Sequence, residues 1–198
     1  MRELIREIVS GYQPVLADPN GGHMPSAVLL LLYERDGLEH LLFQVRSQHV
    51  EHHKGEISLP GGGRDPEDES LLVTALRETE EEIGVARSHI EVFGRLDDVV
   101  TRTNFAMTPY VGAITEPSPY PFQIASIEME MLLEVPVPYL LSGQGWEWTT
   151  NPLGQEMRAY RHDEHLIFGA TARVLSQFLD MLLERRIDGI TGLEATAR

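Results

Sequence analysis

Three glutamates near the middle of the chain have the residue type and the spacing for metal chemistry. Glu78, Glu81 and Glu82 stand at positions i, i+3 and i+4, so on a helix their side chains project from one face as neighbours. Gly84 follows and is a common helix end. The three anions would therefore lie at the negative end of the helix dipole, at a cost of roughly 0.3–1 kcal/mol each. A cation bound against them would offset that cost.

The oxygen ligands of carboxylates suit a hard divalent cation. Mg²⁺ and Mn²⁺ keep several waters and bind through a few carboxylates together with substrate phosphates. We therefore predict a Mg²⁺ or Mn²⁺ site at Glu78, Glu81 and Glu82; the alternative is a solvated acidic helix face. A calcium loop at residues 65–69 is excluded, because this segment lacks the EF-hand spacing and its central glycine.

Arg77 and Glu69 accompany the three glutamates. They are eight residues apart, about two helical turns, so on one helix they lie near the same stripe. Arg77 is well placed to form a bidentate ion pair with Glu81 or Glu69 and to hold its rotamer.

The composition restricts the partners of such a site. The 198 residues include 16 basic and 31 acidic side chains, a net charge of −15, which argues against binding to nucleic acid or to an anionic membrane. A small phosphorylated substrate stays open, because metal ions can mask its charge. The chain has no cysteine, which excludes disulfides, zinc–thiolate sites, iron–sulfur clusters and cysteine nucleophiles.

No segment of the sequence reads as a membrane span or a signal peptide. The longest apolar run, residues 27–33, is far shorter than the ~20 residues that a membrane-spanning helix needs. The first residues alternate charged and apolar types and form no signal-peptide core. We expect a cytoplasmic protein.

Apolar periodicity predicts the elements that would position the site. A helix is expected from about Glu69 to Gly84, because residues suited to a buried face recur there at helical spacing. These residues are Leu72, Ala75 or Leu76, Thr79 and Ile83. Further helices are expected over residues 4–9 and 170–185. Pro60 and three following glycines predict an irregular segment over residues 59–64.

Strands are expected at residues 27–33 and 39–45, paired through an Asp36-Gly37 turn, and at 90–95, 107–114, 157–161 and 166–168. This mixture predicts a sheet covered by helices, an α/β or α+β fold. We expect an N-terminal helix and loop extension at residues 1–24, one main domain at 25–190 and a C-terminal tail at 191–198.

The spacing of the acidic segment resembles a known motif. Gly63, five residues, Glu69, seven residues, then Arg77-Glu78-x-x-Glu81-Glu82-x-Gly84-Val85 is similar to the Nudix box, G-x5-E-x7-R-E-U-x-E-E-x-G-U, where U is a bulky aliphatic residue. The one departure is Thr79, whose hydroxyl we expect to bond a carbonyl of its own helix. The resemblance implies the Nudix α/β/α sandwich, with a mixed sheet flanked by helices, and hydrolysis of a nucleoside diphosphate linked to another group.

The same resemblance implies roles for individual residues. Glu78, Glu81 and Glu82 would bind the metal, and Arg77 and Glu69 would orient them. The general base would be Glu81 within the motif or Glu128 outside it. The alternative for Glu128 is an acid in the first turn of a helix.

Residues upstream resemble the coenzyme A pyrophosphatase branch of that family, L-L-T-x-R-S-x3-R-x3-G-x3-F-P-G-G. The matching positions are Arg46, Ser47, Gly55, Pro60, Gly61 and Gly62, and residues 94–99 and 169–175 are also similar. Three positions depart: Gln44 replaces threonine, Leu59 replaces phenylalanine, and Glu51 replaces arginine. We interpret the first two as packing changes. The positive charge that the branch arginine would supply at position 51 could come from Lys54, or from His52 and His53 when protonated. The alternative for His49, His52 and His53 is that they are surface histidines without a role.

The resemblance implies a small pyrophosphate substrate, with Arg46, Ser47, Gly61, Gly62 and Gly63 beside its phosphates. Coenzyme A or an acyl derivative, cleaved to 4′-phosphopantetheine and 3′,5′-ADP, is the leading candidate. The alternatives are ADP-ribose, NADH or a nucleoside triphosphate as substrate, or a non-catalytic module that senses a nucleotide. Nudix proteins commonly form homodimers, so a homodimer is open too. Trp146 and Trp148 lie in an insert whose role stays open between core packing, an interface and closure over a ligand.

Overall fold

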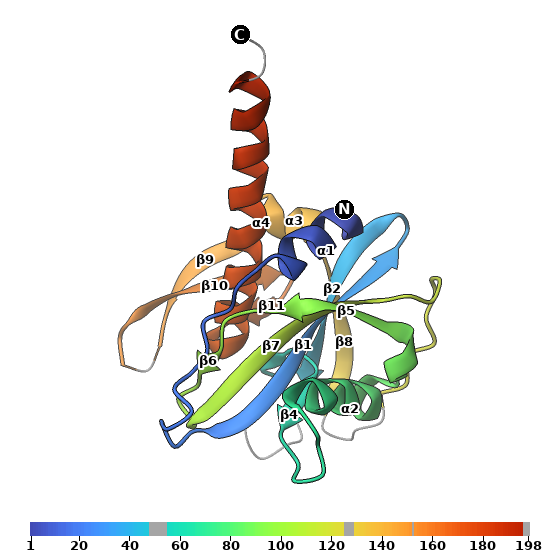
Figure 1. Ribbon diagram of the computed structural model, residues 1–198, viewed down its shortest axis with the longest axis vertical. Helices are drawn as coiled ribbons and strands as arrows, with labels where there is room; N and C mark the ends of the chain where they lie inside the picture. Colours follow the sequence, from blue (N-terminus) through green and yellow to red (C-terminus); the bar gives the residue numbers. More distant parts are fainter. Residues whose placement is uncertain (48–54, 125–128, 152, 196–198) are drawn as a thin grey trace.

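The computed structural model describes residues 1–47, 55–124, 129–151 and 153–195, with the backbone alone described over 186–195 (Figure 1). The helices are α1 (Arg2–Ser10), α2 (Leu71–Ile83), α3 (Val137–Leu141) and α4 (Gly169–Ala195), with a 3₁₀ turn η1 (Arg87–His89). The strands are β1 (Met24–Arg35), β2 (Leu38–Arg46), β3 (Ile57–Ser58), β4 (Gly61–Gly63), β5 (Ile90–Arg95), β6 (Val99–Val100), β7 (Phe105–Ile114), β8 (Met129–Pro136), β9 (Trp146–Thr150), β10 (Glu156–His162) and β11 (His165–Ile167).

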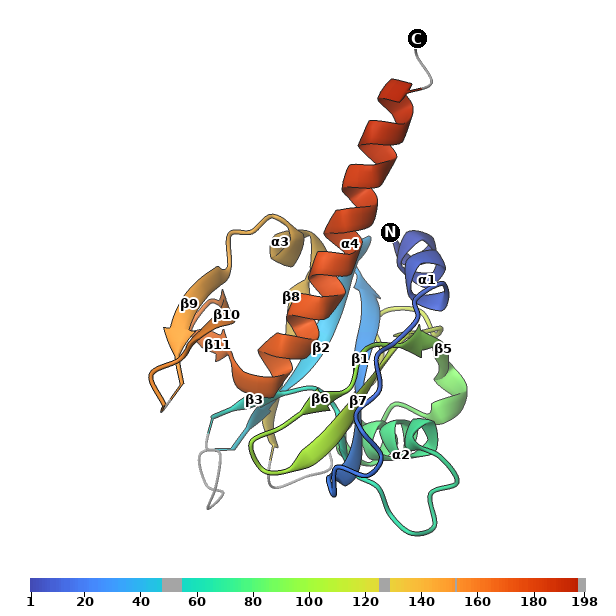
Figure 2. The ribbon, with the colours of Figure 1, turned by 60° about the vertical axis from the view of Figure 1, so that its left-hand side comes forward.

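The strands form a large mixed sheet and a small antiparallel one. The large sheet has the order β3-β2-β1-β7-β5, with β4 on β1, β6 on β7 and β8 on β2. β1 and β7 are parallel, and the other pairs in this sheet are antiparallel. The small sheet has the order β11-β10-β9 and lies beside the first turns of α4 (Figure 2).

Helices cover both faces of the large sheet. Leu29, Leu31 and Tyr33 of β1 pack in one apolar cluster with Ile83 of α2. The intervening residues of β1 face a larger core that includes apolar side chains of α1, α3 and α4. A strand buried on both faces reads as a continuous apolar run, which is the pattern of residues 27–33. The expected mixed sheet flanked by helices is confirmed.

The β1–β2 hairpin forms as its sequence predicts. Asp36 and Gly37 both have positive φ, 53° and 77°, as a two-residue hairpin turn of type I′ requires. Beyond this hairpin the two strands diverge. β3 pairs with β2, β4 pairs with β1, and Leu59-Pro60 crosses between them.

The expectation of an irregular segment at residues 59–64 is wrong for Gly61–Gly63, which form β4. Gly61 has a φ of 145°, and a Cβ there would lie 2.2 Å from the carbonyl oxygen of Ala27. Only glycine allows the backbone to approach β1 this closely. A run of three glycines therefore marks a strand here, at the position where the sheet opens.

The N-terminal segment packs against the main domain. Ile5, Ile8 and Val9 of α1 belong to the larger core. The backbone N–H of Val15 donates to Asp97 Oδ1 at 2.7 Å, and that of Ala17 donates to Asp98 Oδ2 at 2.9 Å. The two aspartates thus hold residues 15–17 along the domain. Among the described residues, no helix is long and apolar enough to cross a membrane.

Candidate active site

α2 presents the motif glutamates and has well-defined ends. Its N-cap is Ser70, whose side chain accepts from the N–H of Val73, and its C-cap is Gly84 in the left-handed conformation, φ 71°. The buried hydroxyl of Thr79 donates to the carbonyl of Ala75 at 2.7 Å, which confirms the expectation from the sequence. The helix begins two residues later than the predicted Glu69, because Ser70 caps it.

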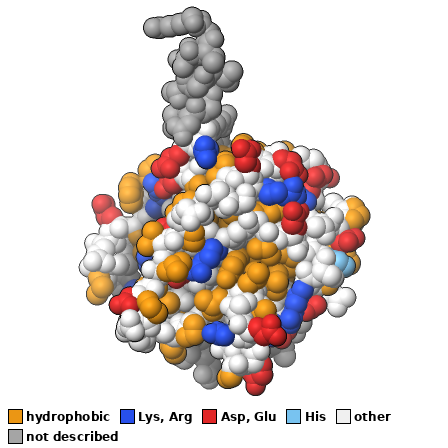
Figure 3. All heavy atoms as spheres, in the orientation of Figure 1, with side chains coloured by type: hydrophobic (Ala, Val, Ile, Leu, Met, Phe, Trp, Pro, Cys, Tyr) orange, Lys and Arg blue, Asp and Glu red, His pale blue; other side chains and the backbone are white. Residues whose placement is uncertain are grey.

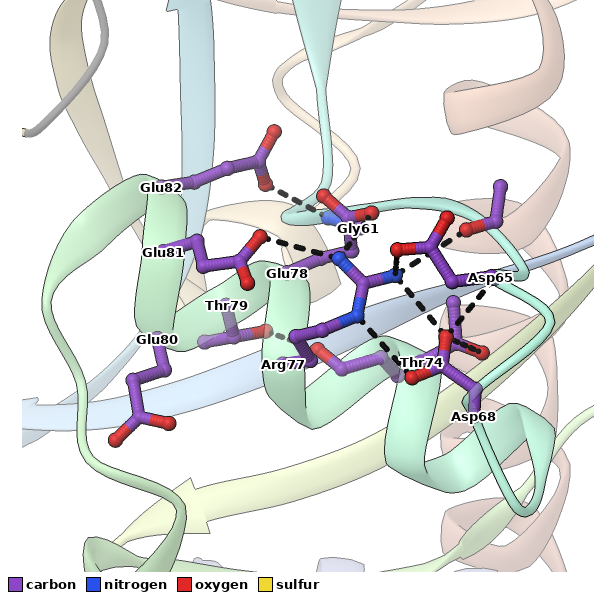
Figure 4. Close-up of polar contacts among 12 residues, drawn as sticks. Gly61, Asp65, Asp68, Thr74, Arg77, Glu78, Thr79, Glu80, Glu81 and Glu82 are labelled. Atoms are coloured by element: carbon purple, nitrogen blue, oxygen red, sulfur yellow. Dashed lines mark hydrogen bonds and ion pairs between the residues drawn. The ribbon is translucent and has the colours of Figure 1, made fainter.

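Glu82 lies where β1 and β2 diverge, and two donors bind the same oxygen of its carboxylate. Nε2 of Gln44 donates to Oε2 at 2.6 Å. The N–H of Gly61 donates to the same oxygen at 2.9 Å, as Figure 4 shows. Burial nevertheless raises the pKa of Glu82 to about 7, because desolvation disfavours the charged form more strongly than the two hydrogen bonds favour it. Glu82 is thus positioned by one residue of β2 and one residue of β4.

Glu78 lies against the glycine strand. A Cβ on Gly62 would come within 2.6 Å of the Glu78 carboxylate, so the absence of a side chain at residue 62 makes room for that group. Burial raises the pKa of Glu78, although the nearby Arg77 opposes the shift. Glu78 in turn raises the pKa of Glu82. Partly buried carboxylates with raised pKa values are typical of a site for a cation.

Arg77 contacts several acids at once. Its Nη1 lies 2.9 Å from Glu78 and 3.1 Å from Glu81, and the pair with Glu81 is one of the two that its position predicts. Its Nε and Nη2 donate to the two oxygens of Asp68, at 3.1 and 3.0 Å. Figure 4 shows the guanidinium between the loop that precedes α2 and the end of the helix that bears Glu81.

The loop acid that holds Arg77 is Asp68, not the Glu69 that its sequence position suggests. Asp68 is 4% exposed, and its hydrogen bonds with Arg77 hold the pKa of its carboxyl well below the usual range. Thr74 also donates to it, at 2.8 Å. Glu69 is exposed. Asp68 precedes the capped helix, so helical periodicity does not reach it, and sequence reasoning missed it.

The donor set fits a hard divalent cation, although the side chains do not form a ready coordination shell. Over the described residues, no three acidic or histidine side chains converge on one point, and Arg77 lies between Glu78 and Glu81. The partly buried carboxylates of Glu78 and Glu82, of which the first raises the pKa of the second, are what Mg²⁺ or Mn²⁺ would neutralise. The exposed Glu81 lies on the same turn of α2.

The substrate-binding candidates lie around these carboxylates. Arg46 follows Gln44 by two residues on β2, and the charge of Arg46 lowers the pKa of Glu82, against the larger effect of burial. Ser47 follows it and is buried. Gly61, Gly62 and Gly63 form β4 beside Glu78 and Glu82. The structure therefore brings the upstream motif and the acidic helix together. His49, Glu51, His52, His53, Lys54 and Glu128 lie outside the described residues.

Gln44 is a second residue that the sequence analysis missed. Its departure from threonine reads as a packing change, but its side-chain amide contacts Glu82 directly. Alternation along β2 was the available signal, because Gln44 shares a face with Leu42, which packs in the cluster on the α2 side of the sheet.

Comparison with known proteins agrees with this geometry. The model of the NUDIX domain matches residues 23–127, and the chain belongs to the Nudix hydrolase family, whose members act as pyrophosphohydrolases on small molecules. Within the family it resembles the coenzyme A pyrophosphatase branch.

Two curated relatives carry that branch resemblance. The uncharacterized Nudix hydrolase NudL of Photorhabdus laumondii is 33% identical over 140 residues, covering 69% of this chain and 74% of the relative. Human mitochondrial coenzyme A diphosphatase NUDT8 is 32% identical over 185 residues, covering 87% and 78%.

A solved structure supports the fold alone. The MutT protein of Methanosarcina mazei Go1 superposes with a TM-score of 0.51 at 17% identity, covering 89% of this chain and 99% of that chain. The Nudix fold expected from the sequence is confirmed.

Proposed function

We propose that this protein hydrolyses the pyrophosphate of coenzyme A, or of an acyl derivative, to 4′-phosphopantetheine and 3′,5′-ADP, with Mg²⁺ or Mn²⁺. The main support is the convergence of two motifs: the β4 glycines lie against Glu82 and Glu78, and the charge of Arg46 acts on Glu82. The similarity to a relative named as a coenzyme A diphosphatase supports the same substrate.

The residues of the site suit attack of water on a phosphorus atom. A pyrophosphate is anionic and repels a nucleophile, so the catalyst must first neutralise charge. A divalent cation held by Glu78, Glu81 and Glu82 would supply that neutralisation and lower the pKa of a bound water. Arg46 would bind a phosphate as a fixed cation. The unblocked backbone of Gly61–Gly63 would let a phosphate approach closely.

Glu81 and Arg77 of α2 would have further roles, in proton transfer and in positioning. Glu81 would accept the proton of the attacking water, because its carboxylate is exposed to solvent and is held by Arg77. Arg77, fixed by the buried Asp68, would act as a positioning residue. Asp68, and not Glu69, binds Arg77. An orienting role for Glu69 would therefore need contacts of its own with the metal-binding glutamates.

Product analysis tests this proposal. The purified protein is incubated with Mg²⁺ and coenzyme A, with ADP-ribose and NADH in parallel, and the products are identified by mass spectrometry. We expect preferential release of 4′-phosphopantetheine. Cleavage of ADP-ribose or NADH with coenzyme A untouched would overturn the proposed substrate. Binding of these compounds without turnover would favour a nucleotide sensor.

Two glutamate-to-glutamine substitutions on α2 test the metal-binding role of Glu82. Glu82→Gln removes a carboxylate of the site, and we expect turnover to fall at least about 100-fold with the fold retained. Glu80→Gln is the matched control, because Glu80 pairs with Arg87 at 2.9 Å and points away from the other glutamates (Figure 4). Near wild-type turnover in Glu82→Gln would contradict the metal assignment.

A cytoplasmic location and a homodimer are also proposals. Cell fractionation tests the first, and sedimentation equilibrium of the full chain tests the second.

A further inference from the structure

A cavity of about 470 Å³ lies beside the small sheet, outside the group of carboxylates. Its walls come from β9, β10, β11, the start of α4 and the turn before β7, and include Thr149, Thr150, Met157, Leu166, Phe168 and Ala170. Figure 2 shows the three strands and the start of α4 side by side at one edge of the molecule. The volume lies within the ~300–1,000 Å³ typical of small-molecule sites.

This cavity shares a wall with a second cavity that is lined by residues of β2 and β3. A smaller cavity of about 220 Å³ shares Glu56, Phe168, Gly169 and Ala170 with it and is also lined by Arg46 and Ser58. Ser58 is directly opposite Gln44 in the β2–β3 pair, and Gln44 donates to Glu82. Arg46 and Ser58 thus line the smaller cavity, and Ser58 pairs with the strand residue whose side chain contacts Glu82.

The wall near the start of α4 is held in place by long-range hydrogen bonds. The hydroxyl of Thr171 donates to the carbonyl of Ile57 at 3.0 Å, which ties α4 to β3. Arg173 donates to the carbonyl of Val100 at 2.9 Å, which ties α4 to β6. The cavity is consequently formed by elements that are already fixed relative to the large sheet.

The chemistry of the larger cavity suits an uncharged chain. Its lining is mostly apolar side chains and threonines, and Arg102 and Glu56 are the charged groups among the described lining residues. A phosphate moved against such a wall would lose its hydration at high cost. A chain of methyl, methylene and amide groups would bury its apolar part, and the threonine hydroxyls could bond its amides.

We infer that this cavity, between the β9–β10 hairpin and the start of α4, binds the pantetheine arm of the substrate. The inference rests on the proposed function, because it takes the pyrophosphate to lie at Glu78 and Glu82 with Arg46 at the entrance to the smaller cavity. The hairpin that contains the insert is then an element of substrate recognition.

Intrinsic fluorescence reports on this cavity without catalysis. The chain has two tryptophans, Trp146 and Trp148, both on β9 and 45% and 61% exposed. Trp148 lies on the same face of β9 as Thr150. The metal-free protein is titrated with each half of the substrate, 4′-phosphopantetheine and 3′,5′-ADP. We expect a saturable change in tryptophan emission with the first and none with the second; the reverse pattern overturns the inference.

Variants that fill the cavity provide a second readout. Thr150→Phe, at an exposed position, and Ala170→Leu should each weaken 4′-phosphopantetheine binding about tenfold or more and raise the KM for coenzyme A, with binding of 3′,5′-ADP unchanged. Leu153→Phe is the control, because Leu153 is at the tip of the same hairpin, 71% exposed, and does not line this cavity. Unchanged phosphopantetheine affinity in both filled variants, with wild-type melting temperatures, overturns the inference.

The two proposals fail in different ways. If the wild-type protein leaves coenzyme A intact, the proposed substrate is wrong, whatever the fluorescence shows. If it cleaves coenzyme A but neither the emission nor the filled variants distinguish the pantetheine half, the proposed substrate holds and the cavity assignment is wrong.

Discussion

Gln44 and Asp68 illustrate how single side chains prepare this site. Gln44 is 5% exposed, and its long side chain carries an amide from β2 to the Glu82 carboxylate. Asp68 is equally buried and holds Arg77 with both of its oxygens. Neither residue belongs to the set that the motifs select. Both act on a motif residue through one well-placed polar contact.

Removing the Gln44 donor should weaken metal binding. Gln44→Met keeps the length of the side chain and removes its hydrogen bond, and a hydrogen bond to a charged group contributes about 1.5–3 kcal/mol. We expect the Kd for Mn²⁺, measured by electron paramagnetic resonance titration, to rise roughly tenfold or more. Gln177→Met is the control, since the side chain of Gln177 accepts a hydrogen bond from the backbone of Asp97 and has no contact with Glu82 among those of the described residues. Equal Mn²⁺ affinity in Gln44→Met and the wild type would contradict this role.

Asp68 and Glu69 should respond differently to the same amide substitution. Asp68→Asn leaves Arg77 without its buried counter-charge, and breaking such a pair costs about 3–5 kcal/mol. Glu69→Gln changes an exposed side chain, so its free energy of unfolding should stay within about 0.5 kcal/mol of the wild type. Urea denaturation of the two variants measures both values. A larger loss in Glu69→Gln than in Asp68→Asn would show that Arg77 depends on Glu69.

At the scale of elements, the site depends on a glycine strand and a capped helix that meet where the sheet opens. β4 supplies a backbone N–H to Glu82 and the space that Glu78 fills. α2 ends at Ile83, and its C-cap Gly84 stops the helix two residues after Glu82. The carboxylates are therefore held between two elements whose positions are set by glycines.

Alanine substitutions in β4 should distinguish close approach from mere flexibility. Gly61→Ala would place a Cβ 2.2 Å from the carbonyl of Ala27 at a φ of 145°, so we expect a loss on the order of 2–4 kcal/mol in the free energy of unfolding. In Gly63→Ala the nearest atom is a ring carbon of Phe105 at 4.0 Å, and the loss should be below about 1 kcal/mol. Chemical denaturation compares the two; equal losses would argue against the steric explanation.

At the scale of the whole molecule, a strongly acidic chain places two partly buried glutamates close enough for one to raise the pKa of the other. Figure 3 shows acidic and basic side chains interspersed around one face, with hydrophobic side chains at its centre. On the surface such charges are solvated and contribute little. Glu78 and Glu82 are partly buried, and their pKa values are raised because burial disfavours the ionised form.

That burial should appear in the pH dependence of stability. The pKa of Glu82 is about 7 in the folded protein against an ordinary 4.5, so between these values the folded state binds a proton that the unfolded state does not. The ionisation of Glu82 should therefore lower the melting temperature of the metal-free protein as pH rises from about 4.5 to 7. Millimolar Mg²⁺ should raise it again above pH 7, because the metal binds the ionised form.

Glu82→Gln should flatten this profile, since its side chain does not titrate, whereas Glu80→Gln should keep the wild-type slope. Differential scanning fluorimetry at several pH values measures all three proteins. A Glu82→Gln profile parallel to the wild type would show that Glu82 is not the titrating group.

Local patterns in the chain were sufficient for several of the elements and for the family. The helical spacing of residues 72–83, the stop at Gly84, the Asp36-Gly37 turn and the motif positions are all local patterns, and the structure agrees with them. Contacts between distant segments were beyond such patterns. The Gln44–Glu82 bond joins residues 38 apart, β4 is a strand because of its proximity to β1, and the cavity beside β9 needs walls from five parts of the chain. Periodicity reports which face of an element is buried, but packing of the whole chain determines what that face meets.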